Sequence, residues 1–138
     1  MENPSEQLPE KYSHRFKKEE RLCSKKLIEK LFAEGDSFLV FPFKIVFVAV
    51  DYQGDYPAKA AFAVSKKLFK KAVHRNLIKR RIREAYRLNK HMLKSESASL
   101  KRAIIFIYIG KEILAFHQME RAMIRGLRIL AKKAIQNP

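Results

Sequence analysis

The sequence predicts an α+β fold, in which helices pack on a small four-stranded sheet within a single domain. The length of 138 residues suits one domain, and 47% of the chain is apolar, which is enough for one modest core. Several short runs are rich in the β-branched and aromatic residues typical of strands, while other segments place apolar residues at helical spacing. In chain order these segments predict the arrangement α-β-β-β-α-β-α.

The first predicted helix begins after Ser24, which can cap its N-terminus, and ends at Gly35. Four apolar residues share one of its faces: Leu27, Ile28, Leu31 and Phe32. Residues 1–14 contain two prolines and no apolar period, so we expect a flexible tail there. The folded domain is therefore expected to span residues 15–138.

The four predicted strands are short and apolar, and they cover Ser37–Phe41, Phe43–Val50, Ala60–Val64 and Ala103–Ile109. Pro42 separates the first two, because proline cannot donate a hydrogen bond within a central ladder. The last strand is apolar almost throughout, which predicts burial on both faces of the sheet. Residues 91–102 are polar and rich in serine, so we expect a loop.

Two further helices are predicted over Lys70–Asn89 and Ala115–Gln136. The second of these carries a core-facing apolar stripe at spacings of three and four, formed by Phe116, Met119, Met123, Leu127, Leu130 and Ala134. The element order thus places two helices after the first hairpin, and both are expected to cover the sheet.

The charge balance indicates a polyanionic partner. The chain has 30 Lys and Arg against 14 Asp and Glu, a formal net charge of +16. Nucleic acid, an anionic membrane surface and an acidic protein can all satisfy such an excess. Cys23 is the only cysteine, which excludes an internal disulfide and suits a cytoplasmic location. The longest apolar stretch, Phe38–Val50, is too short to span a membrane.

The helix predicted over Lys70–Asn89 has a strongly cationic face. Four cations follow one another at i+4 along it, with two polar residues beside them: Arg75, Lys79, Arg83 and Arg87, flanked by Asn76 and Arg80. The opposite side is apolar and is expected to face the core through Val73, Leu77, Ile78, Ile82, Ala85 and Leu88. Lys66 and Lys67 extend the charge ahead of the helix.

This cationic face admits two interpretations. It is a solvated surface, or it is a ridge that binds phosphates, with Asn76 addressing a base or a 2′-hydroxyl. Solvated faces usually mix Glu with Lys, whereas here Glu84 is the one local counter-charge, and like charges at i, i+4 destabilise a helix. Arg also grips phosphate through two parallel N–H bonds. We therefore favour the phosphate ridge.

The sequence around this helix contains Arg75-Asn76-x-x-Lys79-Arg80-x-x-Arg83-Glu84, preceded by Ala72-Val73 and by Ser65-Lys66-Lys67. This pattern resembles that of the protein component of bacterial ribonuclease P. The resemblance extends from about Arg15 through the last helix, because the element order is also similar. The resemblance implies a left-handed βαβ crossover around the basic helix, contrary to the usual rule.

Membership of that family would make the chain a non-catalytic subunit of an endoribonuclease. The associated RNA would cleave precursor tRNA with bound Mg²⁺, and the protein itself would bind no cofactor and require no protein partner. The basic helix would contact the RNA subunit. A cleft between the first helix and the sheet would hold the 5′ leader of precursor tRNA, with Phe32 and Phe47 as stacking aromatics. The alternative for both aromatics is a place in the core.

The chain departs from the family pattern at two places. Leu68-Phe69-Lys70-Lys71 replaces a shorter, glycine-containing stretch, so the turn into the basic helix must be built differently. Ile28 stands where many members have an aromatic, one turn before Phe32. The second departure predicts either weaker leader stacking or stacking on other residues.

The sequence contains no recognisable catalytic or metal-binding constellation. Its four histidines are scattered, without Cys or carboxylate partners at ligand spacing, and it has no phosphate-binding glycine loop. Two alternatives to the ribonuclease P assignment remain open. A structural RNA-binding protein, such as a ribosomal protein, fits the charge and size equally well. A DNA-binding regulator is disfavoured, because no helix-turn-helix pair is evident.

Overall fold

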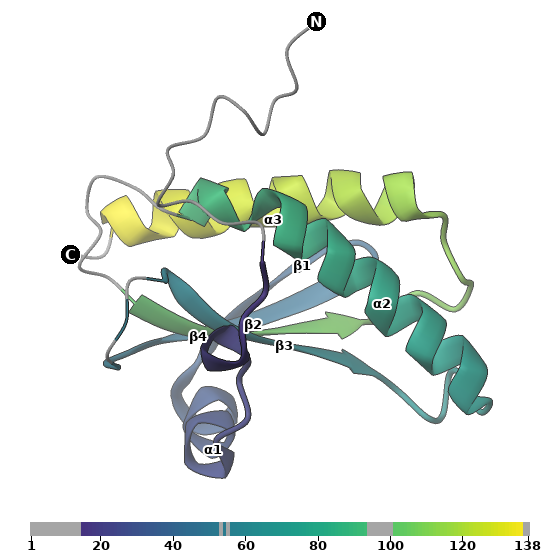
Figure 1. Ribbon diagram of the computed structural model, residues 1–138, viewed down its shortest axis with the longest axis horizontal. Helices are drawn as coiled ribbons and strands as arrows, with labels where there is room; N and C mark the ends of the chain where they lie inside the picture. The colour runs from purple at the N-terminus through teal and green to yellow at the C-terminus, as the bar shows by residue number, and fades with distance from the viewer. Residues whose placement is uncertain (1–14, 53, 55, 94–100, 137–138) are drawn as a thin grey trace, which may run out of the picture.

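A computed structural model of the chain describes residues 15–52, 54, 56–93 and 101–136, with backbone only from residue 134 onward. These residues form an α+β domain whose α-β-β-β-α-β-α order is the predicted one (Figure 1). The elements are η2 (Lys18–Glu20), α1 (Lys25–Glu34), β1 (Asp36–Val40), β2 (Phe43–Val50), β3 (Ala58–Val64), α2 (Ala72–Asn89), η3 (Lys90–Leu93), β4 (Lys101–Tyr108) and α3 (Phe116–Gln136). The predicted tail over residues 1–14 lies outside the described residues.

The four strands form one mixed sheet in the order β1-β2-β4-β3. β2 pairs antiparallel with β1 and β4, whereas β3 and β4 run parallel and are joined through α2. α1 lies on one face of the sheet, and α2 and α3 lie on the other (Figure 1). β4 is central and almost wholly buried, as its apolar sequence predicts.

Side-chain alternation along the strands divides the apolar residues between two cores. The larger core lies under α2 and α3 and includes Phe43 and Ile45 of β2. The smaller core lies under α1 and includes Val46 of β2, with Val48 packed against it. Because successive residues of a strand point to opposite faces, Phe47 belongs to the α3 face.

α1 is limited at both ends by the residues predicted to limit it. The Ser24 hydroxyl oxygen accepts a hydrogen bond from the Leu27 amide at 3.3 Å. The Gly35 amide donates to the Leu31 carbonyl, and a side chain at Gly35 would meet the Leu31 and Phe47 carbonyl oxygens. Glycine is therefore required here, because a Cβ would clash first with the last turn of α1 and then with β2.

The segment ahead of α1 is held to the end of α2 by a buried ion pair. The Lys90 ammonium lies 2.5 Å from a Glu20 carboxylate oxygen, and both side chains are almost fully buried. Lys90 also donates to the Arg15 carbonyl, and the Lys17 amide donates to the other Glu20 oxygen. The ion pair thus joins two residues that are 70 positions apart in the chain.

Several expected boundaries differ from those observed. α2 begins at Ala72 rather than Lys70, and β3 begins at Ala58 rather than Ala60. The segment expected as a loop over residues 91–102 begins within η3 and ends within β4, with residues 94–100 outside the described part. Within the described ranges, none of the helices is both long and apolar enough to cross a membrane.

Candidate nucleic-acid interface

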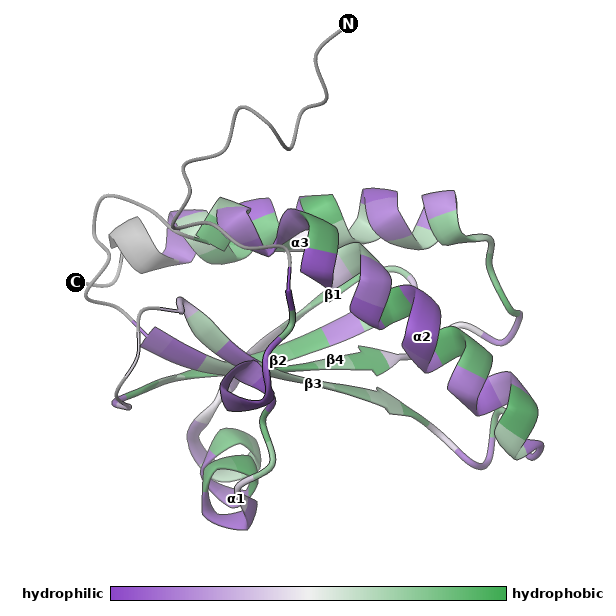
Figure 2. Cartoon of the chain, in the orientation of Figure 1, coloured by the Kyte–Doolittle hydropathy of each residue, from purple (hydrophilic) through white to green (hydrophobic). Residues whose placement is uncertain are grey.

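α2 presents its cations away from the sheet because its apolar residues repeat at helical spacing. Ile78, Ile82, Ala85 and Tyr86 are fully buried against the sheet and α3. Asn76, Arg80 and Arg83 are exposed, whereas Lys79 is half-buried. Hydrophilic residues accordingly line the outward side of α2 (Figure 2). The predicted exposure is confirmed for Asn76, Arg80 and Arg83.

Two apolar residues of α2 do not follow the predicted core face: Val73, and Leu77, which is half-buried and lines a surface pocket. Val73, expected in the core, is 74% exposed. It stands in the first turn of the helix, which extends beyond the ends of the neighbouring strands (Figure 1). The core therefore ends before it reaches this turn, and Val73 faces outward beside the cations.

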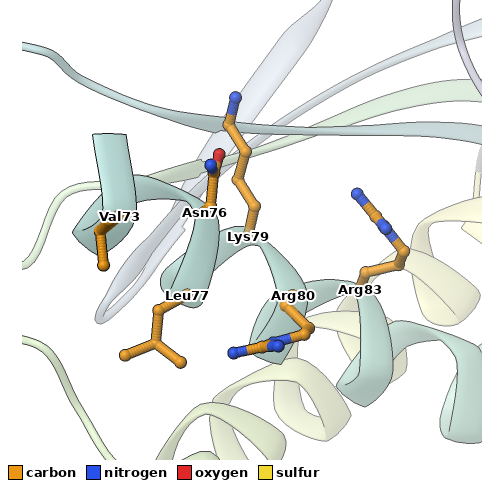
Figure 3. Close-up of a pocket in the computed structure, with 6 residues that line it drawn as sticks. All are labelled: Val73, Asn76, Leu77, Lys79, Arg80 and Arg83. Atoms are coloured by element: carbon orange, nitrogen blue, oxygen red, sulfur yellow. The ribbon is translucent and has the colours of Figure 1, made fainter. Parts of the chain in front are cut away.

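The outward surface of α2 is hollowed. A pocket of about 440 Å³ is lined by Val73, Asn76, Leu77, Lys79, Arg80 and Arg83 (Figure 3). Asn76 and Lys79 project to the same side of the helix, while Arg80 extends beside Leu77 on another side. The pocket thus combines cations, one amide and two apolar side chains, a set that suits phosphate and base contacts on one surface.

Arg75 has a structural function that the sequence pattern did not reveal. Its guanidinium donates to the Phe69 and Lys70 carbonyl oxygens at 2.8 and 2.9 Å. Phe69 is buried against Tyr108, and its amide donates to the Ser65 carbonyl. The unusual stretch before α2 is therefore built around a buried phenylalanine, and Arg75 fixes that turn to the helix.

Arg87, the last cation of the predicted stripe, is engaged within the helix. Its guanidinium donates to both carboxylate oxygens of Glu84, at 3.0 and 2.5 Å. This hydrogen-bonded pairing lowers the pKa of Glu84. Lys66 and Lys67, by contrast, are exposed just ahead of the helix. The charge available to a partner therefore lies on Lys66 and Lys67 ahead of α2 and on Lys79, Arg80 and Arg83 in its middle turns.

Phe32 and Phe47, both proposed as cleft aromatics, lie on different sides of the sheet. Phe32 is 60% exposed on α1. Phe47 is half-buried on the other face, with its ring edge-on to Phe38 and the Lys133 ammonium 5.9 Å from its centroid. The prediction that both aromatics belong to one cleft between α1 and the sheet is wrong, because Phe47 lies on the sheet face that packs against α2 and α3. Ile28 is half-buried and packs on the smaller core.

The sheet face beside α1 carries half-buried apolar side chains that sequence reasoning did not single out. They belong to three strands and are Val48, Val50, Ala61, Ala63 and Ile107. α1 packs on β2 and β4, so the part of this face on β3 is only partly covered. The alternation along β2 was the signal available for this face. Val48 and Val50 point to the same side as Val46, which lies under α1.

These features define a small basic α+β protein whose candidate site is a cationic helix face rather than a set of reactive groups. The part of the chain that is described contains no group of three or more His, Cys, Asp or Glu side chains able to hold a metal. The family model described as Ribonuclease P matches residues 16–131. The chain therefore belongs to the ribonuclease P protein component family, which associates it with that endoribonuclease complex.

Individual relatives agree with this assignment. The ribonuclease P protein component of Porphyromonas gingivalis is 37% identical over 113 residues, covering 80% of this chain and 82% of the relative. That of Dictyoglomus turgidum is 32% identical over 112 residues, covering 80% and 87%. Among solved structures, the RNase P protein of Staphylococcus aureus superposes with a TM-score of 0.63 at 25% identity, covering 79% of this chain and 93% of the other. The Thermotoga maritima protein gives 0.64 at 26% identity, covering 78% and 97%.

Proposed function

We propose that this chain is the protein subunit of a ribonuclease P in which the RNA subunit is the catalyst. The protein binds that RNA through α2 and the 5′ leader of precursor tRNA through the face beside α1. The RNA removes the leader with bound Mg²⁺. The observation that carries the proposal is the outward cationic face of α2, in a chain of this family.

The chemistry of α2 favours RNA over other polyanions. Arg80 and Arg83 are exposed and can each grip a phosphate through paired N–H groups, while Lys79 adds a point charge. Asn76 can donate to and accept from a base edge or a 2′-hydroxyl. Val73 and Leu77 line the same pocket and offer apolar contact to an unstacked base. A uniformly charged membrane surface would use neither the amide nor the pocket.

Leader binding is assigned to the opposite side of the sheet from α2. Phe32 exposes most of its side chain there, and the partly covered face over β3 is apolar. Stacking of unpaired bases on an aromatic ring tolerates any sequence, as a leader of variable sequence requires. Phe47 is not part of this proposal, because it faces α3.

The test compares two charge-matched variants for binding to ribonuclease P RNA alone. One carries Lys79→Gln, Arg80→Gln and Arg83→Gln, and Arg75 is left unchanged because it holds the turn before α2. The control carries Lys25→Gln, Lys26→Gln and Lys30→Gln, which are exposed on α1. Both lose three positive charges, so long-range attraction falls equally.

We expect the α2 variant to bind more weakly, with a log–log salt dependence shallower by about 2 to 3, since each phosphate contact contributes about 0.7–0.9. The control should keep the slope of the unaltered chain. Equal salt slopes in all three proteins would show that the cationic face of α2 is a solvated surface that contacts no phosphates. Tighter binding to ribosomal RNA than to ribonuclease P RNA would instead favour a structural ribosomal role.

A further inference from the structure

α3 carries a second line of cations that is distinct from α2. We name it the α3 ridge, and its members are all on the outer side of the helix: Arg121, Arg125, Arg128 and Lys132. All four are exposed, whereas the core-facing residues Met119, Met123, Leu127 and Leu130 are fully buried. The helix is therefore divided into an apolar half and a cationic half.

The spacing of the α3 ridge makes it a continuous surface. At about 100° per residue, its four members fall within an arc of about 60° opposite the core. At about 1.5 Å per residue, they extend over roughly 16 Å of the helix axis. Three of the four are arginines, the side chain that matches phosphate geometry. Several phosphates of one nucleic-acid strand can be reached from such a surface.

Nothing described on α3 neutralises this ridge. Glu120 is half-buried and accepts a hydrogen bond from the Asn89 amide, away from the ridge. Within the described residues, no ion pair or side-chain hydrogen bond engages Arg121, Arg125 or Arg128. α2 differs, because Arg75 holds a turn and Arg87 is paired with Glu84. Like charges at i, i+4 destabilise a helix, so the ridge lowers the stability of α3 until a polyanion binds.

The position of the α3 ridge separates it from the face assigned to the leader. α3 lies on the opposite side of the sheet from α1 and beside α2 (Figure 1). A base stacked on Phe32 is therefore on the far side of the sheet from the α3 ridge. A large folded RNA that contacts α2 can contact α3 as well, because the two helices pack against each other.

The composition of the ridge favours duplex over single-stranded RNA. Binding to single strands combines cations with aromatic side chains on which bases stack. The large apolar side chains that are exposed in the described residues lie elsewhere, at Phe32, Leu39, Phe41, Leu68, Val73 and Ile109. The described part of α3 places no exposed Phe or Tyr beside these cations, so the ridge suits phosphates whose bases are already paired.

We propose that the α3 ridge is a second RNA-binding surface that contacts the phosphate backbone of a duplex region of the RNA subunit. This inference rests on the proposed function and adds a second contact to it. Two surfaces on adjacent helices would fix the orientation of the protein on the RNA, which a single helix face does less well. The contact is electrostatic and independent of base sequence.

The experiment uses the full chain and ribonuclease P RNA alone. The α3 variant carries Arg121→Gln, Arg125→Gln and Arg128→Gln, and the α1 variant Lys25→Gln, Lys26→Gln and Lys30→Gln again serves as the control of equal charge. Affinity is measured across a range of salt concentrations, and backbone protection of the RNA is mapped by hydroxyl-radical cleavage. A third variant, with Lys in place of the three arginines, retains the charge.

We expect the α3 variant to show a salt slope shallower by about 2 to 3, with the control and the Arg→Lys variant close to the unaltered chain. Protection should be lost in a duplex region that the variant at Lys79, Arg80 and Arg83 still protects. An unaltered slope, or equal reductions in the α3 and α1 variants, overturns the α3 contact alone. Failure of the unaltered chain to bind the RNA overturns the proposed function, and the α3 contact with it.

Discussion

Replacing Phe32 with Ala distinguishes a leader-stacking residue from a packing residue. The ring is 60% exposed, so about 40% of its surface is covered. Full burial of a phenylalanine is worth about 1.5–3 kcal/mol, so this fraction corresponds to about 0.6–1.2 kcal/mol of folding stability. The fully buried Phe43 would lose about 3–5 kcal/mol on the same change. Phe32→Ala should therefore remain folded, with a melting temperature lower by only a few degrees, about 2–5 °C.

Binding should be affected much more than folding. One base stacked on an aromatic contributes about 1–3 kcal/mol, which is roughly 5- to 150-fold in affinity. We expect that loss for precursor tRNA with a leader, measured with the RNA subunit present, and little change for mature tRNA. Phe41, which is 65% exposed in the turn between β1 and β2, provides a matched control. Phe41→Ala should leave the ratio of the two affinities unchanged.

Two results would refute the reasoning. Equal losses for leader-bearing and leaderless tRNA in Phe32→Ala would show that the ring does not contact the leader. A loss of stability near that of a core phenylalanine would show that the ring is packed rather than open. The melting temperature and the two affinities, measured on one preparation, separate these possibilities.

Three further outcomes follow from the packing and the charges. Glu20→Ala should cost about 3–5 kcal/mol in urea unfolding, because it leaves the Lys90 ammonium buried without its partner, and strict additivity in a double-mutant cycle would contradict the pairing. Gly35→Ala should destabilise by about 1–3 kcal/mol, because its Cβ would lie 2.3 and 2.9 Å from two carbonyl oxygens, and an unchanged unfolding midpoint would refute that clash. The pKa of Glu84 is lowered by its hydrogen bond from Arg87, so its stabilisation is present above the ordinary carboxyl pKa and is lost as pH falls through the lower folded value. Between about pH 6 and pH 2 the melting temperature of Glu84→Gln should accordingly fall less steeply than that of the unaltered chain. The same pH dependence in both proteins would count against the pairing.

Much of the fold follows from patterns within single elements. The caps of α1, the apolar stripe of α3 and the outward face of α2 each depend on residues three or four apart, and helical geometry places these without tertiary information. The element order was predictable for the same reason. The family signature lies within one helix and was likewise readable from the sequence.

The errors arise where placement depends on elements far apart in the chain. Alternation along β2 shows that Phe47 and Val48 point to opposite faces, but only the sheet order decides which face carries α1. Val73 fits the apolar side of α2, yet the helix extends beyond the sheet before reaching it. The pairing of Glu20 with Lys90 joins residues 70 positions apart and has no local signal.

The most direct test of the proposed function is cleavage of precursor tRNA at low Mg²⁺ by ribonuclease P RNA, with and without the purified chain. We expect the RNA alone to cleave poorly, the RNA with protein to release the 5′ leader efficiently, and the RNA-free protein to leave the substrate intact. A higher concentration of the Lys79, Arg80 and Arg83 variant than of the unaltered chain should be needed to reach the same cleavage rate. Cleavage by rigorously RNA-free protein, or no stimulation of the RNA by the unaltered chain, would contradict the proposed division of labour between protein and RNA.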